Sequence, residues 1–255
     1  MTLARTALRL CAVEALIGAT IADKRVWDSR VTELNPDEFG SDALPTVLLL
    51  SDKDDGEQMS QNNGGPPFWR SVDLQLEIAM VKRVKLEGTE IYEAEIPDTD
   101  PRLEASLDLF EFQVLRRLQY GQDPLCLMFR KLARITKYDS HRQILDDATP
   151  KQAMRLLTLT CVTQDDRVNL VNTAIEQPTG YDLLPWPLSE VAALLPEGSA
   201  SKQIVDGIVV AIGKVTVPPF TGMDADVVKV GDEEGTADPE AESNVVVISA
   251  DPEQP

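Results

Sequence analysis

Residues that could perform acid–base or nucleophilic chemistry are few in this chain, and they are widely scattered. The sequence of 255 residues contains one histidine, His141, which lies near Asp139 and Arg142 in a segment expected to be a strand. A general acid or base needs a positioned partner and a pocket, and this spacing supplies neither. We therefore predict a solvated surface histidine and a protein that is not an enzyme.

The sequence also lacks the common motifs for metal and phosphate binding. No Cys-x-x-Cys pair or histidine cluster provides zinc ligands. The carboxylates Asp52, Asp54 and Asp55 lack the glycine and terminal glutamate of a calcium-binding loop. Gly64 and Gly65 precede two prolines, which cannot donate backbone N–H groups to a phosphate. We expect no metal ion and no cofactor.

Cysteine usage and charge narrow the classes of partner. Cys11, Cys126 and Cys161 are far apart and have apolar neighbours, which predicts buried free thiols in a reducing compartment. The formal net charge of -19 argues against general binding to nucleic acid or to an anionic membrane. Charged residues interrupt the first 17 residues, so no signal peptide is expected, and no run approaches the length of a membrane span.

Apolar periodicity predicts the order of the structural elements. Helices are expected over residues 3–17, 101–120 and 124–132, a short strand over 25–31, and hairpins from 44–50 with 71–80 and from 133–145 with 152–163. This order predicts an α+β fold, in which helices pack on one face of an antiparallel or mixed β-sheet. A C-terminal extension is expected to follow this body.

The first hairpin is expected to carry a long polar loop. The stretch from Ser51 to Phe68 is too long for a tight turn, and such loops are usually functional or disordered. We predict that it becomes ordered only against a neighbour. Trp69, at the exit of the loop, is expected in the core, with a role as anchor of the loop as the alternative. The candidate loop contacts are Asp52, Asp54, Asp55, Asn62, Asn63 and Trp69.

Composition divides the chain into three parts, residues 1–165, 166–223 and 224–255. The first is a body of mixed charge. The second contains candidate short elements at 188–195 and 202–212, and the β-branched run Ile208-Val209-Val210 leaves the latter open between helix and strand. The third is an acidic, partly extended tail with ten acidic residues and one basic residue.

Arg25, Trp27 and Arg30 are candidate residues of a subunit interface. Tryptophan and arginine are typical interface anchors, and arginine can pair with a carboxylate of a neighbouring subunit. An ordinary solvated face is the alternative for the two arginines, and the sequence leaves both interpretations open.

The order of these segments, rather than any one motif, resembles that of a known family. The segments that carry the resemblance are Arg5 and Ala7, Ala19-Thr20, 23–26, 44–49, Trp69 with 73–78, 103–118 and 155–159. Over roughly residues 3–165, the chain resembles the tail-terminator family of long-tailed bacteriophages, the group that includes the lambda minor tail protein U.

The resemblance implies a homo-oligomeric, hexameric ring that caps the tail tube, ends its polymerisation and joins it to the head or neck. The implied partners are the tail-tube protein and the head–tail connector or neck proteins. DNA would pass through the ring without sequence-specific binding, and no membrane is involved. The protein would be assembled in the host cytoplasm and reside in the virion. The loop 52–68 would face the tube or a neighbouring subunit, whereas residues 166–255 have no counterpart in short family members.

Two alternatives remain open at this point. One is a different neck component, such as a head-completion or head–tail joining protein. The other belongs to a different class, a non-viral soluble adaptor or binding module with an acidic tail.

Overall fold

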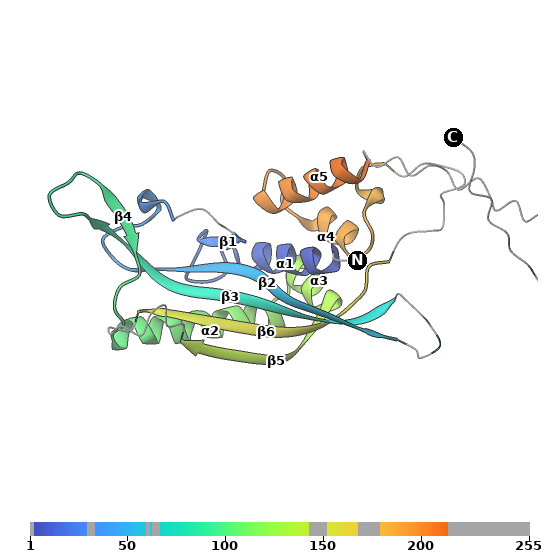
Figure 1. The fold of residues 1–255 in the computed structure, drawn as a ribbon, viewed down its shortest axis with the longest axis horizontal. Helices are drawn as coiled ribbons and strands as arrows, with labels where there is room; N and C mark the ends of the chain where they lie inside the picture. Colours follow the sequence, from blue (N-terminus) through green and yellow to red (C-terminus); the bar gives the residue numbers. More distant parts are fainter. Residues whose placement is uncertain are drawn as a thin grey trace, which may run out of the picture. The chain divides into compact units, whose positions relative to one another are not determined.

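The computed structural model describes residues 3–29, 34–59, 62, 67–142, 152–167 and 179–213 (Figure 1). The α-helices are α1 (Leu3–Leu16), α2 (Pro101–Tyr120), α3 (Pro124–Leu132), α4 (Leu188–Leu194) and α5 (Ala200–Gly213). The strands are β1 (Val26–Asp28), β2 (Leu44–Gln58), β3 (Phe68–Lys85), β4 (Tyr92–Glu95), β5 (Ala133–Arg142) and β6 (Met154–Gln164). Short 3-10 helices lie at η1 (Pro36–Glu38) and η3 (Gly180–Leu183).

The described strands form one mixed sheet in the order β1-β2-β3-β6-β5, and β4 pairs with the C-terminal end of β3. β1 runs parallel to β2, and the other neighbours are antiparallel. The register places Leu49 opposite Leu76, and Leu74 opposite Leu159. Because side chains alternate between the two faces of a strand, this register gathers apolar groups from β2, β3 and β6 on one face.

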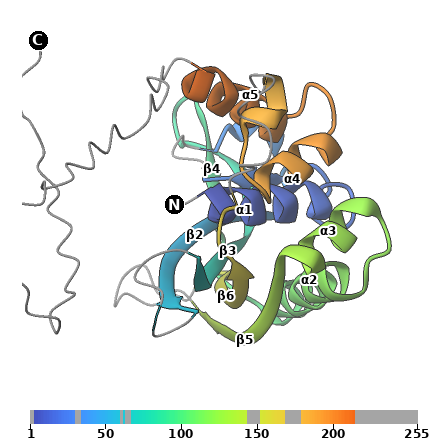
Figure 2. The same cartoon turned by 90° about the vertical axis from the view of Figure 1, so that its right-hand side faces the viewer.

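Helices α1, α2 and α3 pack against that apolar face, on the concave side of the curved sheet (Figure 2). The buried side chains of α2 recur at helical spacing and meet the inward residues of β3. These side chains are Leu107, Phe110, Val114 and Leu118. The predicted α+β class, with helices on one face of the sheet, is therefore confirmed.

Local capping explains where two of these helices begin. The Asp100 carboxylate accepts hydrogen bonds from the backbone N–H groups of Arg102 and Leu103, at 2.7 and 2.9 Å. Asp123 accepts one from Cys126 in the same way. A proline follows each cap, at a position where a missing N–H costs nothing.

Helices α4 and α5 share the hydrophobic core of α1. Leu188, Val191 and Val205 are fully buried in the same cluster as the α1 side chains. The segment 202–212, which the sequence left open between helix and strand, lies within helix α5. The sequence-based boundary at residue 165 thus falls between segments that pack on one core.

The structure corrects the predicted loop between Ser51 and Phe68. β2 continues to Gln58 and β3 begins at Phe68, so Asp54 and Asp55 pair with Val72 and Ser71. The prediction is wrong for residues 51–58, whose polar side chains lie in a strand rather than in a loop. A strand pair that extends beyond the core needs few apolar side chains. Strand β4 is not among the elements that apolar periodicity predicts.

Candidate functional site

A groove on the face of the sheet opposite the helices is built from two neighbouring rows of side chains. In one row, Trp27 of β1 lies beside Leu48 of β2, which lies opposite Glu77 of β3. In the other row, Ala79 lies between Thr46 and Met154. Alternation places all six on the outer face, because Val47, Ile78 and Leu49 point into the core.

Two residues from outside the sheet also line this outer-face groove. Leu34, just before η1, and Ile96, just after β4, line the groove together with the six sheet residues. The cavity volume is about 210 Å³. Its walls are mostly apolar, and Ala79 and Met154 belong to a second hydrophobic cluster that includes Phe39 and Val81. The groove can therefore accept an apolar side chain.

Glu77 contributes a carboxylate to this otherwise apolar groove. Its side chain is partly buried, and none of the described residues forms a hydrogen bond or an ion pair with it. A carboxylate beside apolar walls attracts a cationic partner more strongly than one in bulk water. The groove thus combines apolar contact area with one negative charge that no described residue pairs with.

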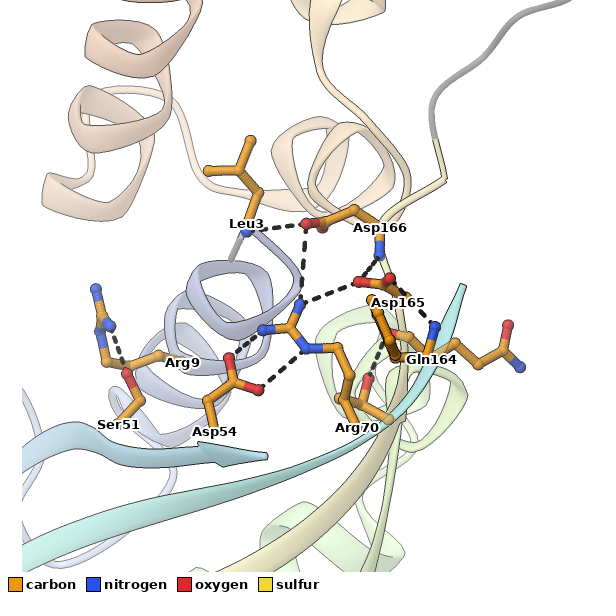
Figure 3. A network of polar contacts seen from close by, with 10 residues as sticks. Leu3, Arg9, Ser51, Asp54, Arg70, Gln164, Asp165 and Asp166 are labelled. Carbon is orange, nitrogen blue, oxygen red and sulfur yellow. Dashed lines mark hydrogen bonds and ion pairs between the residues drawn. The ribbon is translucent and has the colours of Figure 1, made fainter. Parts of the chain in front are cut away.

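The β2–β3 hairpin is fixed to the body by a buried ionic network around Arg70 (Figure 3). The Arg70 side chain is only 5% exposed, and its Nε donates to Asp54 Oδ1 at 3.0 Å. Its Nη1 lies 3.4 Å from Asp165 Oδ1 and 3.9 Å from Asp166 Oδ2. Asp165 also accepts from the backbone N–H of Phe68, at the start of β3. One cation is shared by three carboxylates.

The bulge in β2 creates this network. The register shifts between Ser51 and Asp54, so Asp54 pairs with Val72 and turns to the core face, where Arg70 lies. Without the shift, the alternation from Leu48 and Leu50 would place Asp54 on the outer face.

Asp166 joins the network to the N-terminus of α1. Its Oδ2 accepts from the backbone N–H of Leu3 at 3.2 Å, and its Oδ1 has no hydrogen-bond partner among the described residues. The carboxylate is fully buried. Burial raises the pKa of Asp166, although the Leu3 N–H and the Arg70 charge oppose this increase.

The candidate interface residues have different environments from those predicted. Arg25 is partly buried, and it donates to the backbone carbonyls of Pro45 and Ile21 at 3.0 and 3.3 Å. Trp27 is partly buried and lines the outer-face groove. Arg30 lies outside the described residues. The expectation that Arg25 is an exposed arginine is therefore wrong, because it bridges the turn after α1 to the start of β2.

The candidate loop contacts are split between strands and the hairpin tip. Asp52 and Asp55 are exposed on β2, and Asp52 accepts from Gln75 Nε2 at 3.1 Å. Asn62 is exposed, and Asn63 lies outside the described residues. Trp69 is 50% exposed, so the preference for a core position is wrong. It pairs with Glu57 on the outer face, because Arg70 and Val72 take the inward positions of β3.

The predicted candidates do not form one site. Trp27 lies beside Leu48 in the groove, whereas Asp54 and Trp69 lie toward the other end of the β2–β3 pair. The sequence reasoning missed Arg70, Glu77, Asp165 and Asp166. Two of these residues could have been found from the alternation in β3. Arg70 falls on the same face as the buried Val72 and Leu74, and Glu77 falls on the opposite, solvent-facing side.

The single histidine is exposed, and the three cysteines are buried. His141 is exposed on β5, with Nδ1 3.1 Å from Asp139 Oδ2, as predicted for a surface histidine. The cysteines are free and buried, and burial raises the pKa of Cys126 and Cys161 to about 12. Within the described ranges, no cluster of His, Cys, Asp or Glu is placed to hold a metal ion. None of the described helices is long and apolar enough to cross a bilayer.

Comparison with known proteins adds no assignment: no family model matches the sequence, and no curated protein matches it.

Proposed function

We propose that this chain is a structural virion protein that forms a hexameric ring on the phage tail tube. In this role it ends polymerisation of the tube and joins the tube to the head or neck, as the resemblance to the tail-terminator family implies. The order of the elements carries the proposal. Helix α1, strand β1, the β2–β3 hairpin, helices α2 and α3, and the β5–β6 hairpin follow the order on which the resemblance rests.

The outer-face groove adds support for assembly. A contiguous apolar surface with a charged group is typical of a protein contact rather than of free surface. Helices α4 and α5 lie beyond the part of the chain that the resemblance covers, and their packing on α1 makes them part of each subunit of the proposed ring.

The proposed partners are copies of this chain, the tail-tube protein and the neck proteins. The proposed location is the virion, at the junction of tail and head, after assembly in the host cytoplasm. DNA would pass through the ring. The net charge of -19 supports passage without sticking, because like charges repel the phosphate backbone.

Deletion of the gene tests this function by the length of the tails. Tubes that are much longer than those of the parent phage are the expected result, and complementation with the intact gene should restore normal length. Tails of normal length that fail to join heads would instead favour a head–tail joining protein. A normal yield of infectious virions would exclude a structural role in the tail or neck.

A further inference from the structure

Helix α2 presents a second apolar surface, on the side that faces away from the sheet. Leu109, Phe112 and Tyr120 are 47%, 57% and 69% exposed. With Arg116 they recur at helical spacing, on the side of α2 opposite its buried Phe110. We call the four residues Leu109, Phe112, Arg116 and Tyr120 the α2 stripe. Exposed aromatic side chains around an arginine are the typical composition of an interaction hot spot.

Arg116 differs in its contacts from Arg117 and Glu104 of the same helix. Arg117 pairs with Asp123 at 2.8 Å and donates to the carbonyl of Ala15, while Glu104 pairs with Arg142 and Arg155. No described residue forms a hydrogen bond or an ion pair with Arg116. The side chain lines a shallow depression together with Phe112 and Tyr120. The α2 stripe thus combines apolar contact area with one positive charge that has no partner among the described residues.

The α2 stripe and the outer-face groove are complementary in chemistry. The groove has mostly apolar walls and the carboxylate of Glu77, and the stripe has exposed aromatic side chains and the guanidinium of Arg116. A charge that stands among apolar groups gains most from an opposite charge when the contact excludes water.

The two surfaces lie on opposite sides of one subunit. The α2 helix lies over the core face of the sheet (Figure 2). The stripe is on the side of α2 opposite its buried residues, whereas the groove is lined by side chains of the other face of the sheet. A subunit therefore cannot join its own stripe to its own groove. When two different surfaces of identical subunits meet, the contact is head-to-tail, and its repetition produces a closed ring or a filament.

We infer that the α2 stripe of one copy docks in the outer-face groove of a second copy, with Arg116 paired to Glu77. This inference rests on the proposed function, since it identifies the contact that builds the proposed ring. The occupant of the groove is a second copy of this chain, because the stripe carries the charge opposite to that of Glu77 together with exposed apolar side chains.

Charge reversal at the two positions provides a sharp test. Arg116→Glu or Glu77→Arg alone should place like charges in every contact and raise the subunit dissociation constant at least about tenfold. A mixture of the two variants should assemble again, because each variant's stripe then meets an oppositely charged groove on the other. Alternation around a closed ring requires an even number of subunits, so native mass spectrometry of a rescued hexamer should find three copies of each.

Matched controls separate this contact from a general effect of charge. Arg134→Glu and Glu87→Arg make the same changes at exposed positions, on β5 and in the β3–β4 turn, and should assemble like the parent protein. Circular dichroism melting should show each variant folded, since Arg116 is exposed and Glu77 points away from the core.

The remaining outcomes count against the inference in distinguishable ways. A hexameric parent protein with single variants that assemble normally would overturn the contact and leave the proposed function standing. Single variants that fail to assemble, without rescue in the mixture, would overturn the Arg116–Glu77 pairing. A parent protein that stays monomeric, alone and with tail-tube protein, would overturn both the inference and the proposed function.

Discussion

Arg70 and Asp165 are 95 residues apart in the chain, and Arg70 Nη1 lies 3.4 Å from Asp165 Oδ1 in a site where both side chains are almost fully buried. Together with Asp54, they tie the β2–β3 hairpin to the segment that leaves β6. A buried ionic network holds its members in one arrangement, because any other arrangement leaves a charge without a partner.

Removal of the Arg70 guanidinium should therefore destabilise the folded protein strongly. Arg70→Ala leaves the carboxylates of Asp54, Asp165 and Asp166 together without a counter-charge. We expect a loss of about 3–5 kcal/mol in the free energy of unfolding, measured by urea denaturation at neutral pH. The exposed Arg134→Ala should change it by less than about 0.5 kcal/mol. A loss below about 1 kcal/mol for Arg70→Ala would show that the network is not held in the buried form.

Asp166 should give the protein a particular pH dependence. Its pKa is raised in the folded state, so folding favours the protonated form. Its stabilising contribution is present below the pKa of the unfolded chain and is lost as the pH rises through the folded-state pKa. Asp166→Asn keeps an acceptor for the Leu3 N–H and does not titrate.

The stability of Asp166→Asn relative to the parent should therefore increase as the pH rises from about 3 to 7. Unfolding free energies of both proteins at each pH measure this difference. A difference that stays constant, or that moves in the opposite direction, would mean that Asp166 is not a buried carboxylate with a raised pKa.

The thiols should be unreactive in the folded protein. Burial raises the pKa of Cys126 and Cys161 to about 12, and it also raises the pKa of Cys11. The nucleophilic thiolate is therefore rare at neutral pH. A thiol-exchange reagent should modify all three cysteines in denaturant. It should modify them at least about tenfold more slowly in the native protein. Fast modification of any of the three without denaturant would contradict their buried positions.

Arg25 should behave as a structural residue rather than as an exposed interface residue. Arg25→Ala removes the donors to the carbonyls of Pro45 and Ile21, and we expect a loss of about 1–3 kcal/mol in unfolding free energy. Thermal melting and sedimentation of the same variant separate the two roles. Unchanged stability with weakened self-association would restore the interpretation of Arg25 as an interface residue.

The strongly periodic elements could be predicted from the sequence because their apolar spacing has one interpretation. The buried side chains of α2, which recur at helical spacing, and the Asp100-Pro101 start define that helix within two residues. The alternation from Val72 to Ile78 defines the core face of β3. These are local signals, and the tertiary structure agrees with them.

The parts that could not be predicted depend on contacts between distant segments. The length of β2 follows from pairing with β3, and the inward turn of Asp54 follows from a bulge that the sequence does not mark. Arg25 is held by carbonyls of Ile21 and Pro45, and the sequence does not show which carbonyls lie within reach. The outer-face groove combines residues of β1, β2, β3 and β6, so it exists only once the sheet has formed.

The assembly state of the intact chain tests the central claim most directly. Sedimentation velocity at micromolar concentration, with and without tail-tube protein, measures it in solution. The account predicts a discrete species of six 28.1 kDa subunits, seen as a ring by electron microscopy. A stable monomer under both conditions would contradict the account.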